Sequence, residues 1–294
     1  VWIPRFNAVT PSNYNGGTQA KPNAIDVTFV KQNETAIDAF TFGNKELSGF
    51  WYGKFEVGGT LASSCTNETC NVSNIVVKPN MTSLRSQKVS SYFFASRSME
   101  QPNNSFGFIN SEVDTHMSKN NEWGAVAYLT HSIYGRCTDS TTCTEVGINN
   151  NGSYITGYGA PAGSKYNDTN GAYNTSLGKD ASTTKNIYGI YDMSGGAYEY
   201  VMGVYNKAIG YSGFSSLPDT KYYNNYTGSS YTGHALDETA GWYSDDAYFP
   251  NMSVSWFLRG GHYGNSTIAG VFDFHRGNCQ LDSNYSSRFV ITNE

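Results

Sequence analysis

An aromatic and apolar run that ends at two glycines constrains the fold of this chain more than any other feature. Residues 256–259 read Trp-Phe-Leu-Arg, and Gly260 and Gly261 follow directly. Such a run is typical of a buried strand, and paired glycines suit a turn that needs positive φ or close backbone approach. Apolar residues recur over 268–272 and 289–291, which predicts two more short strands on either side of a polar bend.

The side chains between these predicted strands can almost all hydrogen-bond or stack, and few of them can build a core. We call residues 255–294 the tail. Clusters of polar and aromatic side chains are typical of recognition surfaces. The tail is therefore predicted to carry a ligand-binding face, and the alternative is an ordinary polar loop. The residues of this candidate face are His262, Tyr263, Asn265, Ser266, Thr267, Asp273, His275, Arg276, Asn278, Cys279, Gln280, Asp282, Ser283, Asn284 and Tyr285.

The composition favours a loop-rich protein exposed outside the cell. Of 294 residues, 38% are hydrophobic and 15% are charged, while Gly (31) and Tyr (23) are abundant. This mix favours an extracellular β or α+β protein. The net charge is -5, and acidic and basic residues are interspersed. We therefore expect no nucleic-acid partner, because phosphate contacts need a concentrated basic surface.

Membrane contact is not expected from this segment. A membrane-spanning helix needs roughly 18 or more consecutive apolar residues, and the chain has no such run. The chain begins at Val1 without Met. We expect an N-terminal signal or anchor segment to have been removed or to lie outside this sequence.

Four of the cysteines form two close pairs in loops rich in Thr, Ser and Asn. Cys65 and Cys70 are five residues apart, and Cys137 and Cys143 are six apart. We predict one disulfide within each pair, each worth about 2 kcal/mol. A zinc site would need Cys-x₂-Cys spacing or nearby His ligands, and neither pair shows them, so no metal is expected. Cys279 remains in the tail, either as an inert thiol or as a residue placed there by sequence variation.

Other segments show weaker patterns. His116 and His131 flank the clearest predicted helix, and we predict structural roles for both, without bound metal. Alternating or aromatic runs predict strands at 1–6, 25–30, 49–57 and 75–77. An apolar face predicts a helix at 111–134, and the mixed segment 84–98 is a second helix candidate. A stretch rich in Asn, Gly, Ser and Thr at 138–182 and a stretch rich in Tyr and Gly at 204–250 predict long surface loops.

A glycine pair also lies in the segment 186–203, where Gly195 and Gly196 permit a sharp turn between two packed stretches. Glu199 follows in an apolar setting. A buried carboxylate needs a donor partner, and we predict Arg259 as the partner of Glu199.

The order of these segments resembles the C-type-lectin-fold domains of the formylglycine-generating-enzyme type. The resemblance rests on Phe55-Glu56-Val57, Asn121-Glu122-Trp123, the segment 186–200, Arg259-Gly260-Gly261 and a closing Arg288, and it spans residues 50 to 291. It implies an α+β fold with small antiparallel sheets, one or two helices and long loops, in a single domain over 1–294. It implies structural roles for Trp256, Arg259, Gly260, Gly261, Asp192, Gly195, Gly196, Glu199 and Arg288.

The chain departs from the family pattern where chemistry would be inherited. In the central signature, Gly196 replaces Asn, Ala197 replaces Val and Tyr200 replaces Trp. The related enzymes place a copper-binding cysteine pair just beyond the glycine pair, but residues 264–270 contain no Cys. Without two thiolates the copper site cannot form. We therefore expect a protein that is not an enzyme, with no catalytic residues.

The tail is similar to that of the variable proteins of diversity-generating retroelements, whose C-terminal residues are rewritten on a fixed lectin-type scaffold. This resemblance implies a ligand-binding adhesin displayed on a cell surface, on a pilin-like protein, or on a phage tail, with an unknown protein or glycan as its partner. The alternatives are an enzyme of formylglycine-generating type and a structural subunit of a filament or virion. We expect no cofactor; Asp and Asn are plentiful, but no spaced motif indicates calcium, so a structural calcium ion stays open.

Overall fold

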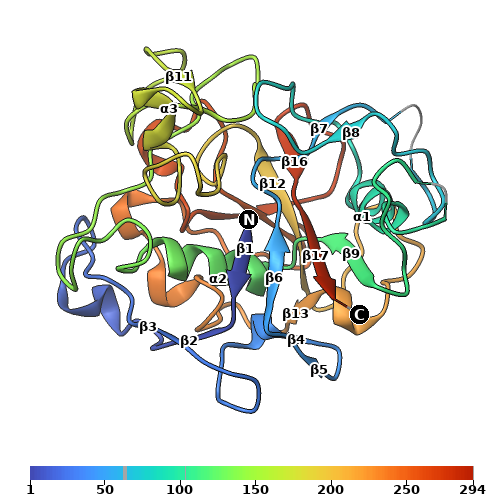
Figure 1. Ribbon diagram of the computed structural model, residues 1–294, viewed down its shortest axis with the longest axis horizontal. Coiled ribbons are helices and arrows are strands. Elements are labelled where there is room, and N and C mark those ends of the chain that lie inside the picture. Colours follow the sequence, from blue (N-terminus) through green and yellow to red (C-terminus); the bar gives the residue numbers. More distant parts are fainter. Residues whose placement is uncertain (62–64, 103, 294) are drawn as a thin grey trace.

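A four-stranded antiparallel sheet contains both the first and the last strand of the chain (Figure 1). The computed structural model describes residues 1–61, 65–102 and 104–293. The strands follow the order β1 (Trp2–Pro4), β6 (Gly49–Tyr52), β17 (Phe289–Asn293) and β9 (Val113–Met117). The last strand therefore lies between β6 and β9, which places the end of the tail inside the framework of the fold.

A second sheet is built around β12 (Tyr198–Tyr205) and contains most strands of the tail. Strand β12 pairs antiparallel with β14 (Trp256–Arg259), and β14 pairs antiparallel with β15 (Phe274–Gly277). The other two strands, β13 (Asn224–Tyr226) and β16 (Tyr285–Ser287), pair parallel to β12. This sheet is therefore mixed, whereas the other sheets of the described residues are antiparallel, as expected.

The remaining elements are short, as expected for a loop-rich α+β chain. Two-stranded antiparallel sheets are formed by β2 (Phe6–Ala8) with β3 (Val27–Phe29), β4 (Thr41–Phe42) with β5 (Lys45–Glu46), β7 (Gly58–Gly59) with β8 (Ile75–Val76), and β10 (Tyr158–Gly159) with β11 (Gly171–Ala172). The α-helices of the described residues are α1 (Val89–Ser98), α2 (Asn120–Thr130) and α3 (Ser176–Asp180). None of these helices is long and apolar enough to cross a membrane.

The clearest predicted helix, 111–134, is wrong in its first part. Residues 113–117 form β9, which pairs with β17, and only residues 120–130 are helical. The helix begins at Asn120 because the Glu122 carboxylate accepts a hydrogen bond from the Lys119 backbone N–H at 2.8 Å. A carboxylate in the first turn that accepts from the backbone N–H before the helix is typical of a helix start. The predicted helix at 84–98 is confirmed from Val89 onward.

The strand predicted at 268–272 does not form. Residues 266–268 make a 3₁₀ turn, and the Phe272 backbone N–H donates to the Asp245 carboxylate at 3.0 Å instead of to another strand. The Asp273 N–H then closes a turn onto Gly270 O. The apolar run here packs without a β ladder.

The β12 sheet separates the two main hydrophobic cores. Phe257 of β14 packs into one core with Trp123 of α2, while Trp256 and Leu258 pack into the other with Tyr92 of α1. Side chains alternate across a strand, so a strand with a core on each side must be apolar throughout. This explains the continuous apolar run that ends at Arg259, where all four residues of β14 are buried.

Candidate ligand-binding face

Buried ionic and hydrogen-bonding contacts fix the framework under the tail. The Arg288 guanidinium pairs with the Glu199 carboxylate, with Nε to Oε2 at 3.0 Å, and both side chains are buried. The prediction that Arg259 is the partner of Glu199 is wrong. Arg259 lies opposite Glu199 in the strand register, but its guanidinium donates to Ala235 O at 2.9 Å and to the Asn120 side chain at 3.2 Å.

The glycines that the resemblance marks as structural lie at a crowded junction beside this pair. The Gly195 N–H donates to Gly260 O at 2.9 Å, so the two glycine pairs are in direct contact. Gly196 has φ +71°, and an added Cβ would lie 2.3 Å from the Glu56 carboxylate. Only glycine fits such a position without strain.

Asp192 connects this junction to the long loop that follows α2. Its buried carboxylate accepts hydrogen bonds from the Gly157 N–H at 2.9 Å and from the Asn149 amide at 2.8 Å. Burial is the largest influence on this carboxyl and raises its pKa, while Arg288 opposes the rise. The loop 138–182 is therefore held against the start of β12.

The tail residues divide into a surface set and a buried set. Asp273 and Cys279 are both fully buried, so the prediction that they belong to a binding face is wrong. Burial raises the pKa of the Asp273 carboxyl, with Asp245 adding to the rise, and burial also raises the pKa of the Cys279 thiol. The exposed candidates are Thr267, Arg276, Gln280 and Ser283, and the half-buried candidates are His262, Tyr263, Asn265, Ser266, His275, Asn278, Asp282, Asn284 and Tyr285.

Hydrogen bonds fix the loop that follows Gly260 and Gly261. The Tyr263 N–H donates to Gly196 O at 2.9 Å, and the His262 N–H donates to the Asn265 side chain at 2.7 Å. The indole N–H of Trp123 donates to Val271 O at 2.9 Å. Backbone that is tied down at several points presents its outward side chains in fixed positions, as a preorganised binding surface requires.

Two of the tail segments meet in a continuous series of rings, which we call the aromatic row. Neighbouring ring centroids lie 4.9 to 5.7 Å apart. The two ends are exposed, at 55% for Tyr166 and 48% for Tyr248, whereas Tyr198 is buried beneath the middle. In order, the row contains Tyr166, Tyr263, His262, Tyr198, His275 and Tyr248.

Residues outside the tail contribute to this surface, and the sequence reasoning missed them. Tyr166 belongs to the loop 138–182, where Gly163 O also accepts a hydrogen bond from the Ser266 hydroxyl at 2.7 Å. Tyr248 lies in the second loop, and its N–H donates to Phe274 O at 2.8 Å. The abundance of Tyr in both loops was the available signal, but nothing in the sequence placed either loop beside the tail.

The tail segment 278–285 packs against a third segment from outside the tail, which contains Arg85 and Ser86. The Ser86 N–H donates to Asp282 O at 3.1 Å, and Arg85 hydrogen-bonds to Ser283 O. The Arg85 guanidinium carbon also lies 3.8 Å from the ring centroid of Tyr154. This part of the face therefore combines a stacked guanidinium with exposed hydroxyl and amide groups.

The face carries both signs of charge and offers stacking and hydrogen-bonding groups. Arg85 and Arg276 are accompanied by Asp282, and Asp246 lies near His275. Burial lowers the pKa of His262, against the opposing effect of Asp282, so this imidazole is mostly neutral at neutral pH. Neutral rings flanked by hydroxyls and amides are characteristic of recognition surfaces.

Both predicted disulfides, Cys65–Cys70 and Cys137–Cys143, are present. The prediction that neither pair has a nearby histidine is wrong. A ring nitrogen of His131 lies within 4.8 Å of the sulfurs of Cys137 and Cys143.

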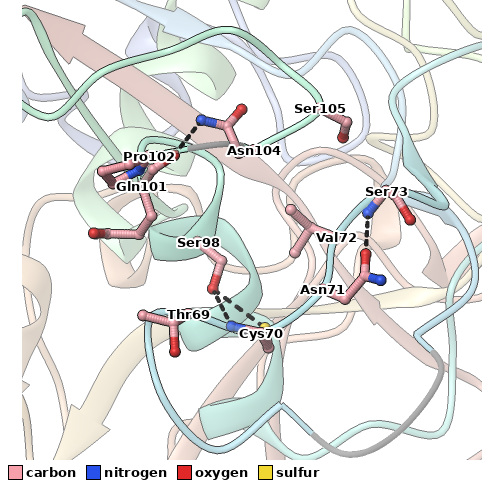
Figure 2. Close-up of a pocket in the computed structure, with 10 residues that line it drawn as sticks. All are labelled: Thr69, Cys70, Asn71, Val72, Ser73, Ser98, Gln101, Pro102, Asn104 and Ser105. Atoms are coloured by element: carbon pink, nitrogen blue, oxygen red, sulfur yellow. Dashed lines mark hydrogen bonds between the residues drawn. The ribbon is translucent and has the colours of Figure 1, made fainter.

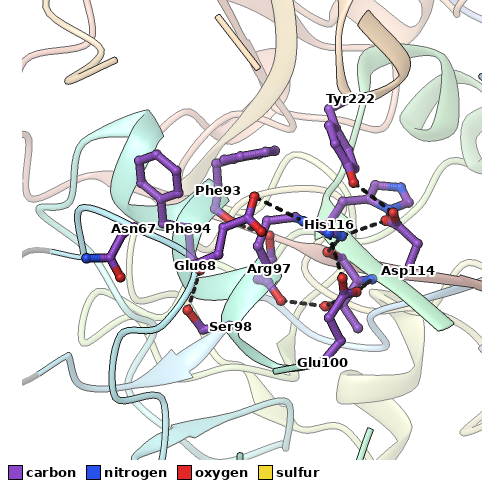
Figure 3. Close-up of polar contacts among 12 residues, drawn as sticks. Asn67, Glu68, Phe93, Phe94, Arg97, Ser98, Glu100, Asp114, His116 and Tyr222 are labelled. Atoms are coloured by element: carbon purple, nitrogen blue, oxygen red, sulfur yellow. Dashed lines mark hydrogen bonds and ion pairs between the residues drawn. The ribbon is translucent and has the colours of Figure 1, made fainter. Parts of the chain in front are cut away.

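Two polar features lie away from the tail, near α1. A cavity of about 490 Å³ is lined by hydroxyl and amide side chains, including Ser98 and Asn71, beside the Cys65–Cys70 disulfide (Figure 2). On the same helix, Arg97 pairs with Asp114, which also contacts His116 at 2.9 Å (Figure 3). His116 is fully buried and contacts Glu122 as well. These contacts fit the structural role predicted for this histidine.

No protein-family model and no curated protein matches the chain. Among solved structures, Treponema denticola variable protein 1 is similar over 60% of this chain and 47% of its own, with 15% identity and a TM-score of 0.27. A Major Tropism Determinant U1 variant is similar over 99% of this chain and 64% of its own, with the same identity and TM-score. The chain thus spans about half of the first protein and less than two thirds of the second, and at this TM-score neither similarity decides its fold or function.

Proposed function

We propose that the chain is a surface-displayed ligand-binding protein, an adhesin or receptor-binding protein built on a C-type-lectin scaffold of the formylglycine-generating-enzyme type. Its ligand would be a protein or glycan on a cell surface. The tail would form the centre of the binding face, and a diversity-generating retroelement would vary it. Display would occur outside the cell, on a pilin-like protein or on a phage tail.

One observation supports this proposal: the tail contains buried residues that anchor its strands and, between them, loop residues that form a surface. Trp256, Arg259 and Arg288 are fully buried and hold the strands, whereas the polar and aromatic side chains of the loops between them, apart from Asp273 and Cys279, are exposed or half-buried. A fixed backbone with adaptable outward residues is the arrangement that antibody-like binding surfaces use. The aromatic row supplies rigid contact area at low cost in conformational entropy.

The enzyme alternative lacks the cysteine pair of the related oxidases, since Cys279 is the single cysteine of the tail and its thiol is buried. A structural subunit would bury the tail in subunit contacts. Iodination of the intact particle or cell distinguishes this case, because Tyr166 and Tyr248 would be labelled on an adhesin and protected in a subunit contact.

The decisive test is to sequence the codons for residues 255–294 in sibling isolates together with the neighbouring genes. We expect substitutions at exposed positions such as Arg276 and Gln280, with Trp256 and Gly260 unchanged. A near-copy template beside a reverse transcriptase gene is also expected. Substitutions spread evenly over buried and exposed codons, or a uniform tail without a template, would contradict diversification and leave an adhesin for one fixed ligand or a structural subunit.

A further inference from the structure

Three metal-binding atoms meet at the end of α2. Cys137 and Cys143 face each other in an antiparallel bridge, with Cα atoms 3.9 Å apart, and are joined as a disulfide. His131, the residue after α2, brings a ring nitrogen within 4.8 Å of both sulfurs. His131 is 2% exposed and Cys137 is 6% exposed. The three donors therefore share one largely buried location that the fold itself creates.

The hydrogen bonds of His131 set its tautomer. Its Nε2 lies 3.2 Å from both Pro22 O and Asn23 O. Carbonyl oxygens can only accept, so Nε2 carries the hydrogen and Nδ1 keeps the lone pair. Metal-binding histidines are commonly oriented this way, with the second ring nitrogen donating to a backbone carbonyl.

Surrounding aromatic rings hold the imidazole in place. The ring of Trp242 lies edge-on at 5.2 Å and the ring of Phe272 at 5.5 Å. A ligand whose orientation is fixed by packing loses little entropy when it binds a metal. His131 is therefore preorganised, and only the sulfurs must change state before a metal can bind.

We propose that the Cys137–Cys143 loop is a redox-gated zinc site, in which reduction of the disulfide allows both sulfurs and His131 to bind Zn²⁺. Two thiol molecules, or one dithiol, supply two electrons and two protons to the disulfide and leave as the oxidised disulfide. Zn²⁺ then displaces the two thiol protons to solvent. It binds two thiolates and the imidazole nitrogen, and a water molecule takes the fourth position.

The donor set selects the metal. Thiolate and imidazole ligands suit Zn²⁺, which is usually tetrahedral and accepts three protein ligands with one open position. Metal binding would hold the loop closed in place of the disulfide, so the loop would stay folded in a reducing setting. This inference does not rest on the proposed ligand-binding function.

The second disulfide of the chain provides a matched control. Cys65 and Cys70 are separated by five residues and Cys137 and Cys143 by six. The Cys70 sulfur contacts the Ser98 hydroxyl at 3.2 Å, a weak zinc donor compared with imidazole. Reduction therefore exposes two thiols at each location, but only one location combines them with the His131 nitrogen.

The test uses the whole chain, reduced with a phosphine, desalted without oxygen and titrated with Zn²⁺ against a chromophoric chelator. Co²⁺ serves as a spectroscopic probe of thiolate binding. The C65S/C70S variant should bind one equivalent of Zn²⁺ after reduction and none before it, with a thiolate-to-cobalt absorption band. The C137S/C143S variant should bind at least about tenfold more weakly, as loss of ligands predicts.

Two substitutions at His131 complete the test. His131→Gln should weaken Zn²⁺ binding by at least about tenfold, whereas His131→Cys, which restores a donor, should retain it. Circular dichroism of the oxidised variants checks that each is folded. Equal affinities of the C65S/C70S and C137S/C143S variants, or unchanged affinity in His131→Gln, would overturn the proposal.

Discussion

The Arg288 guanidinium and the Glu199 carboxylate form a fully buried ion pair that connects the last strand of the chain to β12. Arg288 also donates to Gly53 O at 2.7 Å and to Tyr191 O at 2.9 Å. One side chain thus joins three segments that are far apart in sequence. The last residue of the candidate face, Tyr285, lies three positions before Arg288, so the pair anchors the chain just beyond the end of that face.

Removing one partner of this pair should destabilise the fold strongly. We expect Arg288→Met to lower the free energy of unfolding by about 3–5 kcal/mol, because Glu199 is left buried without a counter-charge. The double variant R288M/E199L should lose less than R288M alone, since it leaves no unpaired charge. Urea unfolding measures both, with Arg276→Met, at an exposed position, as the control. A double variant that is less stable than R288M would contradict this account.

The second glycine after β14 should tolerate no side chain. Gly261 has φ +71°, and an added Cβ would lie 2.8 Å from the Ala269 backbone, which cannot move without displacing the tail loop. Gly107 has a similar φ of +76° with nothing within 4 Å of an added Cβ. Gly107→Ala should therefore lower the free energy of unfolding by about 1–2 kcal/mol through backbone strain alone. Gly261→Ala should lower it clearly more, because crowding against Ala269 adds to the strain. Equal losses in urea unfolding would show that crowding at Gly261 is unimportant.

The buried position of Cys279 should restrict which residues a varied tail can carry there. Cys279 is 0% exposed, and its neighbour Gln280 is exposed. We expect Cys279→Tyr to cost about 1–3 kcal/mol or more through overpacking, and Gln280→Tyr to change stability by less than about 0.5 kcal/mol. Thermal unfolding of the two variants checks this. A stable Cys279→Tyr protein would mean that the interior near this position can open.

The sequence predicts buried strands and disulfides correctly where the local residue pattern agrees with the place of those residues in the tertiary structure. The run at 256–259 reads as a buried strand because β14 has a hydrophobic core on each side. The two disulfides follow from short cysteine spacing. The first part of the predicted helix at 111–134 failed because pairing of β9 with β17 outweighs local propensity, which is a weak influence on its own.

Features that depend on distant segments could not be read from the sequence. Arg259 and Arg288 are both buried, and only the packing decides which of them meets Glu199. Tyr166 and Tyr248 join the face because two long loops fold back against the tail. The burial of Asp273 also depends on tertiary packing, and no local sequence pattern indicates it.

Stability should fall at high pH because of His116. Burial lowers the pKa of this imidazole, but Glu122 and Asp114 outweigh burial and raise it above its usual 6.5. The native state therefore holds a proton that the unfolded state loses above about pH 6.5. Stability is fully present below that pH and is lost as pH rises through the folded pKa, by at most about 1.4 kcal/mol per pH unit. Urea unfolding from pH 6 to 9 should show a shallower slope for His116→Gln, and identical slopes would contradict a charged His116.

His131 should produce the opposite dependence. Burial lowers its pKa to about 4, only partly offset by the carbonyls of Pro22 and Asn23. Between about pH 6.5 and 4 the unfolded chain binds a proton that the native chain excludes. Stability is therefore fully present above about pH 6.5 and is lost as pH falls, by at most about 1.4 kcal/mol per unit.

In the oxidised, metal-free protein, His131→Gln should remove this contribution. The measurement is the difference in unfolding free energy between the original chain and the variant across that range, because carboxyl groups common to both cancel. A difference that stays constant with pH would show that folding does not lower the pKa of His131.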